Sequence, residues 1–373
     1  MRVAIDYTPA LTQRAGIGRF ARGLVRGLAS RATDLEILLV AAAERAQTDC
    51  PEPPFPLRRF PLGSRAMDIL WHRLRLPLPA DWWTGPLDLY HATDFLLPPL
   101  RCRGAVTVHD LSFLRHPEFH HPALVRYLRD RIRGSVHRAA LVLTDSHFSR
   151  DEVLALLDAP PERVQVVYGG AEECFQPVPA PERQGVLARH GLAEPYLLFV
   201  GTLEPRKNLG ALLEGFGRLR RRGLPHTLAI AGGEGWLGEG QRLRRLAEPI
   251  GDTVRFLGFV ADNDLPALLS GADLFVYPSL YEGFGLPVIE AMACGCPVAC
   301  SRAGSLPEVA GDVAFYFETA DAHEIARVLE GALEAPDLLA ERRRQGLVRA
   351  ATFTWNAAAR QLLDAYESTL SRP

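Results

Sequence analysis

The chain has 373 residues, of which 47% are hydrophobic and 23% are charged, and its formal net charge at pH 7 is −2. This length suits two domains rather than one core, and the nearly balanced charge argues against nucleic acid as a partner. No apolar stretch is long enough to cross a bilayer. The six cysteines lack the paired spacing of a zinc site or a disulfide framework. We therefore expect a globular protein of the reducing cytoplasm.

Short apolar runs alternate with helical stretches along the whole chain. In the first half, strands are predicted at 3–5, 37–40, 105–108, 141–143 and 164–167, and helices at 20–28, 124–136 and 151–157. In the second half, strands are predicted at 197–200, 228–231, 255–257, 274–276, 297–300 and 313–317, followed by a terminal helix at 355–370. Continuous apolar strands separated by helices are typical of parallel sheets covered on both faces. The pattern predicts an α/β fold with two doubly wound, Rossmann-like domains.

The boundary between the domains is expected where Pro177, Pro179 and Pro181 stiffen the chain. We predict an N-terminal domain at 1–172, a linker at 173–190 and a C-terminal domain at 191–354. The C-terminal helix within 355–373 is expected to pack back on the first domain. Ligands of such sheets bind outside the carboxyl ends of the strands, in a cleft.

Lys207 is the one lysine among the 42 cationic side chains, and all the others are arginine. A lysine ammonium is a compact, mobile point charge, whereas a guanidinium is a wide planar fork. Lys207 follows the apolar run 196–200, so it is expected just outside the carboxyl end of a buried strand. This position favours binding of a phosphate group; the alternative is a surface lysine retained by chance.

A second cluster follows the predicted strand at 274–276 and reads Tyr-Glu-Gly-Phe-Gly-Leu-Pro-Val-Ile-Glu-Ala-Met at 281–292. Gly283 and Gly285 allow the backbone to approach a ligand, and the free N–H groups of a helix start suit a diphosphate. Glu290 lies within that helix and could accept hydrogen bonds from ribose hydroxyls. Glu282 precedes the turn and is expected to face the cleft. The alternative is one acid within a helix and one surface glutamate.

Glu282 and Glu290 form an E-x7-E pattern that resembles the retaining GT-B glycosyltransferases of sequence family four, also described as glycosyl transferases group 1. That family includes bacterial mannosyltransferases. The likeness extends through 200–208, 231–233 and 304–308, and in the amino half through 16–18, 108–111 and 144–149. The resemblance implies a GT-B fold, with an acceptor-side first domain facing a nucleotide-sugar-binding second domain across the cleft.

The resemblance also implies roles for single residues. Lys207 and Arg206 would bind the donor diphosphate. Glu290 would hold the ribose, Glu282 the hydroxyls of the transferred sugar, and His109 would lie beside that sugar. The other expected donor contacts are Gly16 and Gly18 over the diphosphate, Thr202 where many relatives have an arginine, Val260 at the base, and the backbone of Phe284, Gly285 and Leu286 at the phosphates.

The implied reaction is hexosyl transfer with retention, from GDP-mannose to a growing, lipid-linked glycan in the biosynthesis of a cell-surface polysaccharide such as lipopolysaccharide. The alternatives within the class are dTDP-rhamnose, UDP-glucose and UDP-galactose as donors; outside it, the alternative is a non-catalytic nucleotide-sugar-binding protein. We expect no cofactor and no metal, because cationic side chains and a helix N-terminus can stabilise the departing phosphate. Relatives are thought to use front-face attack, in which that phosphate takes the acceptor's proton. Asp110 could take part, or serve only in a turn.

Three motifs imitate other sites. Gly16-Ile-Gly18-Arg-Phe-Ala21 fits the dinucleotide fingerprint but lies about ten residues beyond its strand, which argues against such a site. Asp262-Asn263-Asp264 resembles a metal-binding DxD motif, but capping of the next helix is favoured. His116, His120 and His121, with Glu118, lack helical ligand spacing. We interpret them as a loop that contacts acceptor.

The segment 124–138 sets Leu124, Leu128 and Ile132 on one stripe and arginines elsewhere. One interpretation is docking on anionic lipid, with Trp82 and Trp83 adding to the surface. This would place the protein peripherally on the inner face of the cytoplasmic membrane. The other is a core-packed helix with a solvated arginine face. The sequence supports the two equally.

Overall fold

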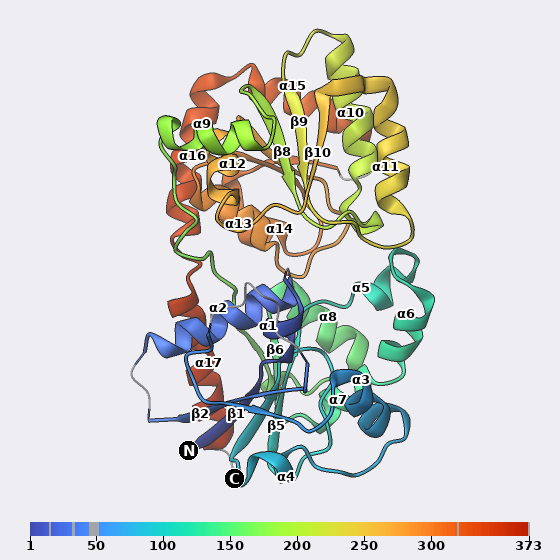
Figure 1. Ribbon diagram of the computed structural model, residues 1–373, viewed down its shortest axis with the longest axis vertical. Coiled ribbons are helices and arrows are strands. Elements are labelled where there is room, and N and C mark those ends of the chain that lie inside the picture. The colour runs from blue at the N-terminus through green and yellow to red at the C-terminus, as the bar shows by residue number, and fades with distance from the viewer. Residues whose placement is uncertain (15, 32–33, 45–51, 319–320, 372–373) are drawn as a thin grey trace. The chain divides into compact units, whose positions relative to one another are not determined.

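The computed structural model describes residues 1–14, 16–31, 34–44, 52–318 and 321–371. The chain forms two compact units. The first comprises Met1–Arg115, Ala123–Gly170 and Thr354–Pro373, and the second His116–Pro122 and Ala171–Phe353. Each unit is built on its own parallel sheet flanked by helices (Figure 1). The predicted α/β architecture with two Rossmann-like halves is confirmed.

The sheet of the first unit has the strand order β3-β2-β1-β4-β5-β6-β7. From β1 the chain builds outward to β3 and then returns, so that β4 pairs with the other side of β1. This reversal creates a switch point between β1 and β4, where ligands of open α/β sheets bind. The strands are β1 (Arg2–Asp6), β2 (Glu36–Ala41), β3 (Leu57–Arg59), β4 (Leu89–Ala92), β5 (Arg103–Val108), β6 (Leu141–Thr144) and β7 (Val164–Val166).

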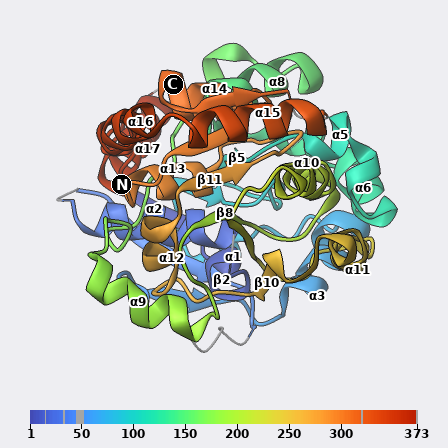
Figure 2. The same cartoon turned by 90° about the horizontal axis from the view of Figure 1, so that it is seen from above.

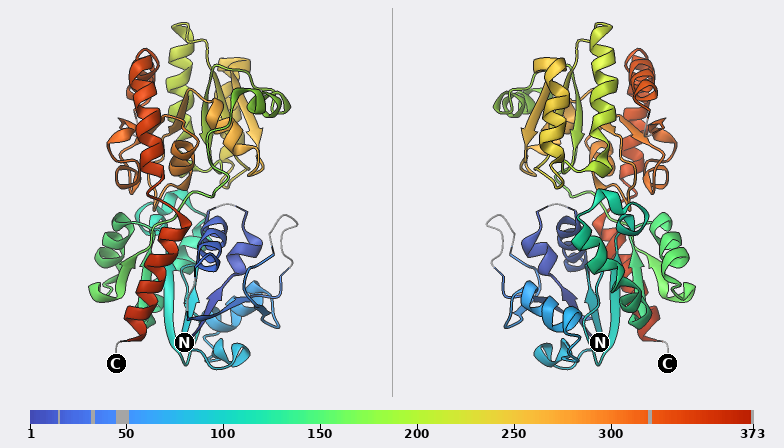
Figure 3. Two further views of the ribbon diagram at one scale, coloured as in Figure 1. Left: turned by 90° about the vertical axis from the view of Figure 1, so that its left-hand side faces the viewer. Right: turned by 90° about the vertical axis from the view of Figure 1, so that its right-hand side faces the viewer.

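The terminal helix α17 (Trp355–Leu370) belongs to the first unit and packs against α2 (Ile17–Ala29) (Figure 3). The rings of Phe20 and Trp355 meet edge to face at 5.5 Å between centroids. The other helices are α1 (Thr8–Thr12), α3 (Ser64–Asp68), the π-helix η1 (Ile69–Arg73), α4 (Asp81–Thr84), α5 (Ser112–Arg115), α6 (Pro122–Arg129), α7 (Ile132–Arg138), α8 (His147–Leu157) and the short η3 (Pro161–Arg163).

The sheet of the second unit has the order β10-β9-β8-β11-β12-β13, with its switch point between β8 and β11. Both strands are deeply buried, as expected where helices cover both faces. The strands are β8 (Tyr196–Val200), β9 (Thr227–Ala231), β10 (Val254–Gly258), β11 (Leu274–Tyr277), β12 (Val298–Ser301) and β13 (Phe315–Phe317).

Helix α10 (Leu209–Arg221) of the second unit packs between α11 (Glu239–Ala247) and α15 (Ala322–Leu333) (Figure 2). The unit also contains α9 (Ala180–Arg189), α12 (Leu265–Gly271), α13 (Leu286–Ala293), α14 (Leu306–Ala310), α16 (Pro336–Ala350) and the short helices η2 (Pro117–Phe119), η4 (Pro205–Lys207), η5 (Glu248–Thr253) and η6 (Gly311–Val313). Among the described residues, no helix has both the length and the apolar character needed to cross a membrane.

The structure differs from the sequence prediction in several places, and strand β3 is one element that was not predicted. The central strand β4 escaped prediction because His91 interrupts its apolar run; its ring nitrogens hydrogen-bond Tyr366 and Thr107. The helix predicted at 124–136 is two helices, α6 and α7. Leu128 and Ile132 are buried but Leu124 is 45% exposed, so the core-packed interpretation fits the first two residues and is wrong for Leu124. Residues 180–189, expected in a linker, form α9, which packs on α12.

Candidate functional site

The predicted phosphate-binding residues lie at the switch point of the second sheet. Arg206 and Lys207 belong to η4, which follows β8, and Glu282 belongs to the loop that follows β11. Because β8 and β11 are parallel neighbours, their carboxyl ends lie side by side. The topology therefore brings together residues that are 75 positions apart in the sequence.

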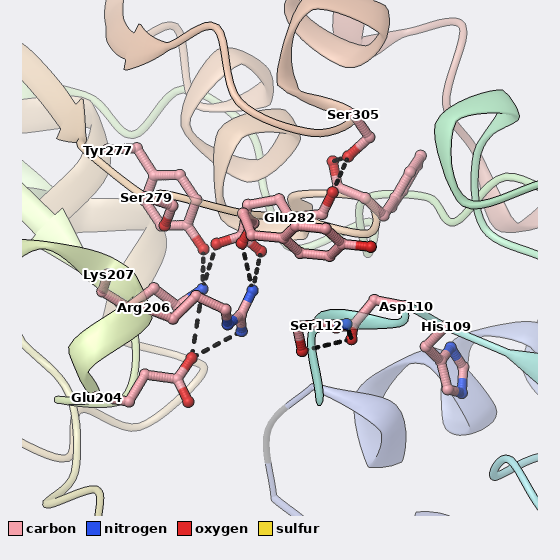
Figure 4. Close-up of polar contacts among 12 residues, drawn as sticks. His109, Asp110, Ser112, Glu204, Arg206, Lys207, Tyr277, Ser279, Glu282 and Ser305 are labelled. Carbon is pink, nitrogen blue, oxygen red and sulfur yellow. Dashed lines mark hydrogen bonds and ion pairs between the residues drawn. The ribbon is translucent and has the colours of Figure 1, made fainter. Parts of the chain in front are cut away.

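Four charged side chains form a buried cluster at this edge (Figure 4). Lys207 Nζ lies 2.6 Å from Glu282 Oε1, and Arg206 Nη1 lies 3.0 Å from Glu282 Oε2. Glu204 completes the cluster, since its Oε1 lies 2.7 Å from Arg206 Nη2 and 3.9 Å from Lys207 Nζ. The most exposed of the four side chains is Arg206, at 14%. Two cations and two carboxylates are thus paired away from water.

The cluster shifts the protonation equilibria of its members. Burial alone would raise the pKa of Glu282, but the neighbouring Arg206 and Lys207 overcome that effect and lower it to about 2. Burial and the adjacent Arg206 lower the pKa of Lys207 below its usual value, while Glu282 and Glu204 act in the opposite direction. Glu282 is therefore held as a carboxylate by its two cationic partners.

Hydrogen bonds to the backbone fix the loop that carries Glu282. The Arg206 guanidinium donates to the Tyr281 carbonyl at 2.7 Å, and Ser305 donates from its N–H to the Glu282 carbonyl at 3.0 Å and from its hydroxyl to the Phe284 carbonyl at 2.8 Å. Gly304 has φ +60°, and a Cβ there would lie 2.3 Å from the Glu282 carbonyl oxygen. Only glycine permits this close approach.

The diphosphate-binding backbone was predicted at the start of a helix, and α13 begins there. Gly285 is its N-cap with φ +99°, and Leu286 is its first residue. Glu290 lies in the second turn of this helix and is 2% exposed. The Phe284 ring packs edge to face on Phe353. The helix start thus presents its N–H groups beside the charged cluster.

The two remaining predicted positions of this unit, Thr202 and Val260, follow β8 and β10, which are separated in the sheet by β9. Val260 is buried just after β10, and Thr202 is half-buried just after β8. They are therefore at the same carboxyl edge of the sheet as Lys207 and Glu282.

In the first unit, His109 follows β5 and is bound on both sides of its ring. Nδ1 lies 2.7 Å from Asp145 Oδ2 and Nε2 lies 2.9 Å from the Thr93 carbonyl oxygen. The Thr93 carbonyl can only accept, so Nε2 carries a proton, and an ionised Asp145 accepts from a protonated Nδ1. Burial lowers the pKa of His109, but Asp145, Asp94 and the Thr93 carbonyl outweigh it and raise the pKa to about 9. To bind a sugar hydroxyl, either N–H would have to leave its present acceptor.

The two predicted glycines also lie in the first unit. Gly16 is the exposed N-cap of α2 with φ +55°, which suits close approach of a ligand. Gly18 is buried, and a Cβ there would lie 1.9 Å from the Gln13 carbonyl oxygen. The structure therefore gives Gly18 a packing reason for being glycine. Asp110 accepts hydrogen bonds from the N–H and hydroxyl of Ser112 and so forms a turn.

The motif Asp262-Asn263-Asp264, which resembles a metal-binding DxD motif, has partners within the protein at Asp264. Asp264 occupies the N-cap position of α12, but its side chain does not cap the helix. It pairs instead with Arg189 and His190, at 2.8 Å and 2.9 Å. Over the part of the chain that the structure describes, no group of three His, Cys, Asp or Glu could hold a metal ion.

The histidine loop at 116–122 packs within the second unit. His116 stacks on Phe119 and meets Tyr281 edge to face, while His120 stacks on Trp236. The Trp236 indole N–H donates to the Phe119 carbonyl at 2.6 Å. The loop is thus held by aromatic contacts next to the residue that precedes Glu282.

Three residues of the two sites escaped sequence reasoning. Glu204 lies two residues before Arg206 and three before Lys207, and a carboxylate so close to two cations in the sequence could have indicated an ion pair. Asp145 lies at the end of β6 and Tyr277 at the end of β11, where polar residues at strand ends are functional candidates. Their pairing with His109 and Lys207 depends on strand order, which the sequence alone did not supply.

Comparisons with known proteins cover both halves of the chain. The family described as Glycosyl transferases group 1 matches residues 188–348, and Glycosyltransferase Family 4 matches 14–173. O-antigen chain mannosyltransferase B of Escherichia coli is 36% identical over 315 residues, which cover 83% of this chain and 81% of that protein. The chain belongs to this glycosyltransferase family.

Two further relatives extend the comparison. The MMP alpha-(1->4)-mannosyltransferase of Mycolicibacterium hassiacum is 33% identical over 238 residues, which cover 62% of this chain and 54% of that protein. The structure of Anabaena HepE in complex with UDP and glucose has a TM-score of 0.80 at 20% identity, covering 99% of this chain and 100% of that one. At this identity the structural likeness shows the GT-B fold alone. The family membership makes the chain a hexosyltransferase.

The paired His109 yields a pH-dependent prediction. His109 should be charged at pH 7.5. Its charged form should stabilise the folded protein fully below about pH 6.5, the pKa of histidine in the unfolded chain, and this stabilisation should be lost as the pH rises through about 9. Asp145→Asn removes the anionic partner, so the midpoint should fall by more than about one pH unit. NMR titration of the imidazole nitrogens measures this.

His91 is an internal control in the same unit, because burial and the nearby His109 lower its pKa to about 3. It should stay neutral throughout the titration in both proteins. An unchanged His109 midpoint in Asp145→Asn would show that the carboxylate does not hold the proton.

Proposed function

We propose that this hexosyltransferase transfers mannose from GDP-mannose, with retention, to a growing lipid-linked glycan of a cell-surface polysaccharide. The observation that carries the proposal is the buried cluster in which Lys207 and Arg206 face Glu282 beside the start of α13. A cation pair and a helix N-terminus are suited to a diphosphate. A carboxylate next to them is suited to sugar hydroxyls.

The chemistry requires stabilisation of charge on the leaving group. The bond between the sugar C1 and the diphosphate oxygen breaks, so negative charge grows on that oxygen while the new bond to the acceptor oxygen forms. In the proposed site Lys207, Arg206 and the N–H groups of α13 would meet this charge, and groups of this kind stabilise it without reorganisation. The acceptor's proton passes to the departing phosphate oxygen, so the reaction needs no strong protein base.

Donor binding has to change the pairing in the cluster. In this structure Glu282 uses both of its oxygens on Lys207 and Arg206. A diphosphate that binds these cations competes with Glu282, which then becomes available to the hydroxyls of the sugar. We assign the ribose to Glu290, which lies in the second turn of α13. Glu282 would thus act in turnover and Glu290 mainly in donor affinity.

The choice of mannose follows the named relatives, since both curated proteins compared above are mannosyltransferases. HepE was solved with UDP and glucose, and UDP-glucose is therefore the second candidate donor. The base-specific contacts would lie near Val260. Its burial at the end of β10 gives the base an apolar neighbour but does not distinguish guanine from uracil.

The donor is tested by calorimetry with GDP, UDP, dTDP and ADP in buffer that contains EDTA, followed by transfer from the matching nucleotide sugars to lipid-linked mannoside acceptors. We expect GDP to bind at least about tenfold more tightly than the others, a difference of about 1.4 kcal/mol. Transfer from GDP-mannose should survive EDTA and retain the anomeric configuration.

Preference for UDP or dTDP would replace the donor while leaving a hexosyltransferase. Loss of activity in EDTA that magnesium restores would overturn metal independence. Failure of every nucleoside diphosphate to bind would contradict the assignment of the cluster.

A lipid-linked acceptor also requires a way to reach a membrane surface, and α6 offers one. Leu124, Arg126 and Arg129 are exposed on this helix, whereas Val125 and Leu128 are buried. The arginines of α7 are engaged within the protein: Arg133 pairs with Asp158, and Arg138 donates to the Leu97 carbonyl at 2.6 Å. We therefore assign peripheral binding on the inner face of the cytoplasmic membrane to α6 alone.

Replacing both Arg126 and Arg129 with glutamine should weaken binding to vesicles that contain phosphatidylserine. An arginine near an anionic surface contributes about 1 kcal/mol, so the loss should be roughly thirtyfold at low salt. Arg133→Gln removes a charge that is already paired and should change binding little. Sedimentation with vesicles at two salt concentrations measures both. Equal effects of the two variants, or no vesicle binding by the wild type, would exclude α6 as the docking surface.

A further inference from the structure

Tyr277, the last residue of β11, has its ring fixed from two directions. The Phe199 ring, on the neighbouring strand β8, stacks on it at 5.8 Å between centroids and 17° between planes. The Phe275 ring, two residues earlier on β11, stacks at 5.7 Å and 21°. Tyr277 is 1% exposed. The aromatic stack therefore determines where its hydroxyl group points.

The hydroxyl points at the ammonium of Lys207 (Figure 4). Lys207 Nζ donates to Tyr277 Oη at 2.6 Å, the same distance as to Glu282 Oε1, and lies 4.8 Å from the Tyr277 ring centroid. Burial raises the pKa of Tyr277 well above 10, so the hydroxyl remains neutral. Lys207 thus has one anionic and one neutral partner.

The Tyr277 hydroxyl and the Glu282 carboxylate should respond differently when a donor binds. A diphosphate competes with the Glu282 carboxylate for the ammonium, but it has no reason to displace a buried, uncharged hydroxyl. Tyr277 can therefore keep its hydrogen bond while the anionic partner of Lys207 changes. This leaves the remaining ammonium protons free to meet phosphate oxygens.

We propose that Tyr277 is a positioning residue, whose hydroxyl holds the Lys207 ammonium charged and aimed at the diphosphate of the donor. This inference rests on the proposed donor site. The charged groups that face Lys207 are Glu282, Glu204 and Arg206. Burial and Arg206 disfavour the charged form of Lys207. A hydrogen-bond acceptor that stays in place while the diphosphate replaces Glu282 offsets part of this free-energy cost.

Tyr277→Phe tests the hydroxyl alone, because a phenylalanine ring keeps the stack with Phe199 and Phe275. Without the hydroxyl, a buried ammonium proton loses its acceptor, and the pKa of Lys207 should fall further. Tyr196→Phe is the matched control. Tyr196 is equally buried in the same unit, and its hydroxyl donates to the Leu268 carbonyl at 2.5 Å, outside the charged cluster.

The experiment is calorimetric titration of the wild type and both variants with GDP and with guanosine, at intervals from pH 7 to pH 10. For Tyr277→Phe, GDP affinity should fall about tenfold, and the pH at which it is half lost should move about one unit lower, as expected for one hydrogen bond to a charged group. Guanosine affinity should be unchanged. Tyr196→Phe should follow the wild type at every pH, even if its unfolding temperature drops.

In the transfer assay, Tyr277→Phe should lower kcat more than it raises KM for the donor, because the charge on the phosphate grows in the transition state. Coincident pH curves for Tyr277→Phe and the wild type, or an equal shift in Tyr196→Phe, would overturn the positioning role while the donor site stands. If the wild type binds no nucleoside diphosphate, the donor site is wrong and the role of Tyr277 falls with it. If the wild type binds another nucleoside diphosphate more tightly than GDP, the same comparison is made with that nucleotide and its nucleoside, and the same outcomes decide the role of Tyr277.

Discussion

The second unit depends on keeping four buried charges paired at the carboxyl ends of β8 and β11. Removing an ion from water costs several kcal/mol, and only a close opposite charge with further hydrogen bonds offsets that cost. Glu282 supplies the charge for Lys207 and Arg206, and Glu204 supplies a second carboxylate. The protein therefore neutralises the two cations, which we propose bind phosphate, with its own side chain. In this proposal a diphosphate donor takes over that pairing, which links donor binding to release of the carboxylate that would meet the sugar.

The same pairing of a buried cationic group with a carboxylate appears in the first unit. There a single cation, the His109 imidazolium, is buried against Asp145 and the Thr93 carbonyl at the ends of β4, β5 and β6. In both units the charges lie at the carboxyl edge of a parallel sheet, where strand ends converge and the backbone turns toward the next helix. A single rule of sheet topology thus places all the charged candidates, although they come from distant parts of the sequence.

Much of this could be predicted from the sequence, and the remainder has physical reasons. Apolar runs identified the strands that are buried on both faces, and Gly285 marked the start of α13 to the residue. Strand β4 was missed because its buried histidine satisfies both ring nitrogens through Tyr366 and Thr107, which lie far from it in the sequence. The side-chain partners of Lys207 were not predicted, because Tyr277 and Glu282 become its neighbours only once β8 and β11 are paired. The sequence left open whether the stripe of Leu124, Leu128 and Ile132 faces the core, and the structure buries Leu128 and Ile132 but exposes Leu124.

The most direct test of the central claim is the effect of Lys207→Ala on the binding of GDP relative to guanosine, together with the rate of transfer. If the ammonium holds the diphosphate, GDP affinity in the variant should approach guanosine affinity. Turnover should fall roughly a hundredfold, which corresponds to a rise of about 3 kcal/mol in activation free energy. As a control, Lys207→Ala should remain folded at the assay temperature and bind guanosine with unchanged affinity. This would show that the nucleoside site survives when Glu282 loses its Lys207 partner. Near-normal GDP affinity and turnover in Lys207→Ala would contradict the account.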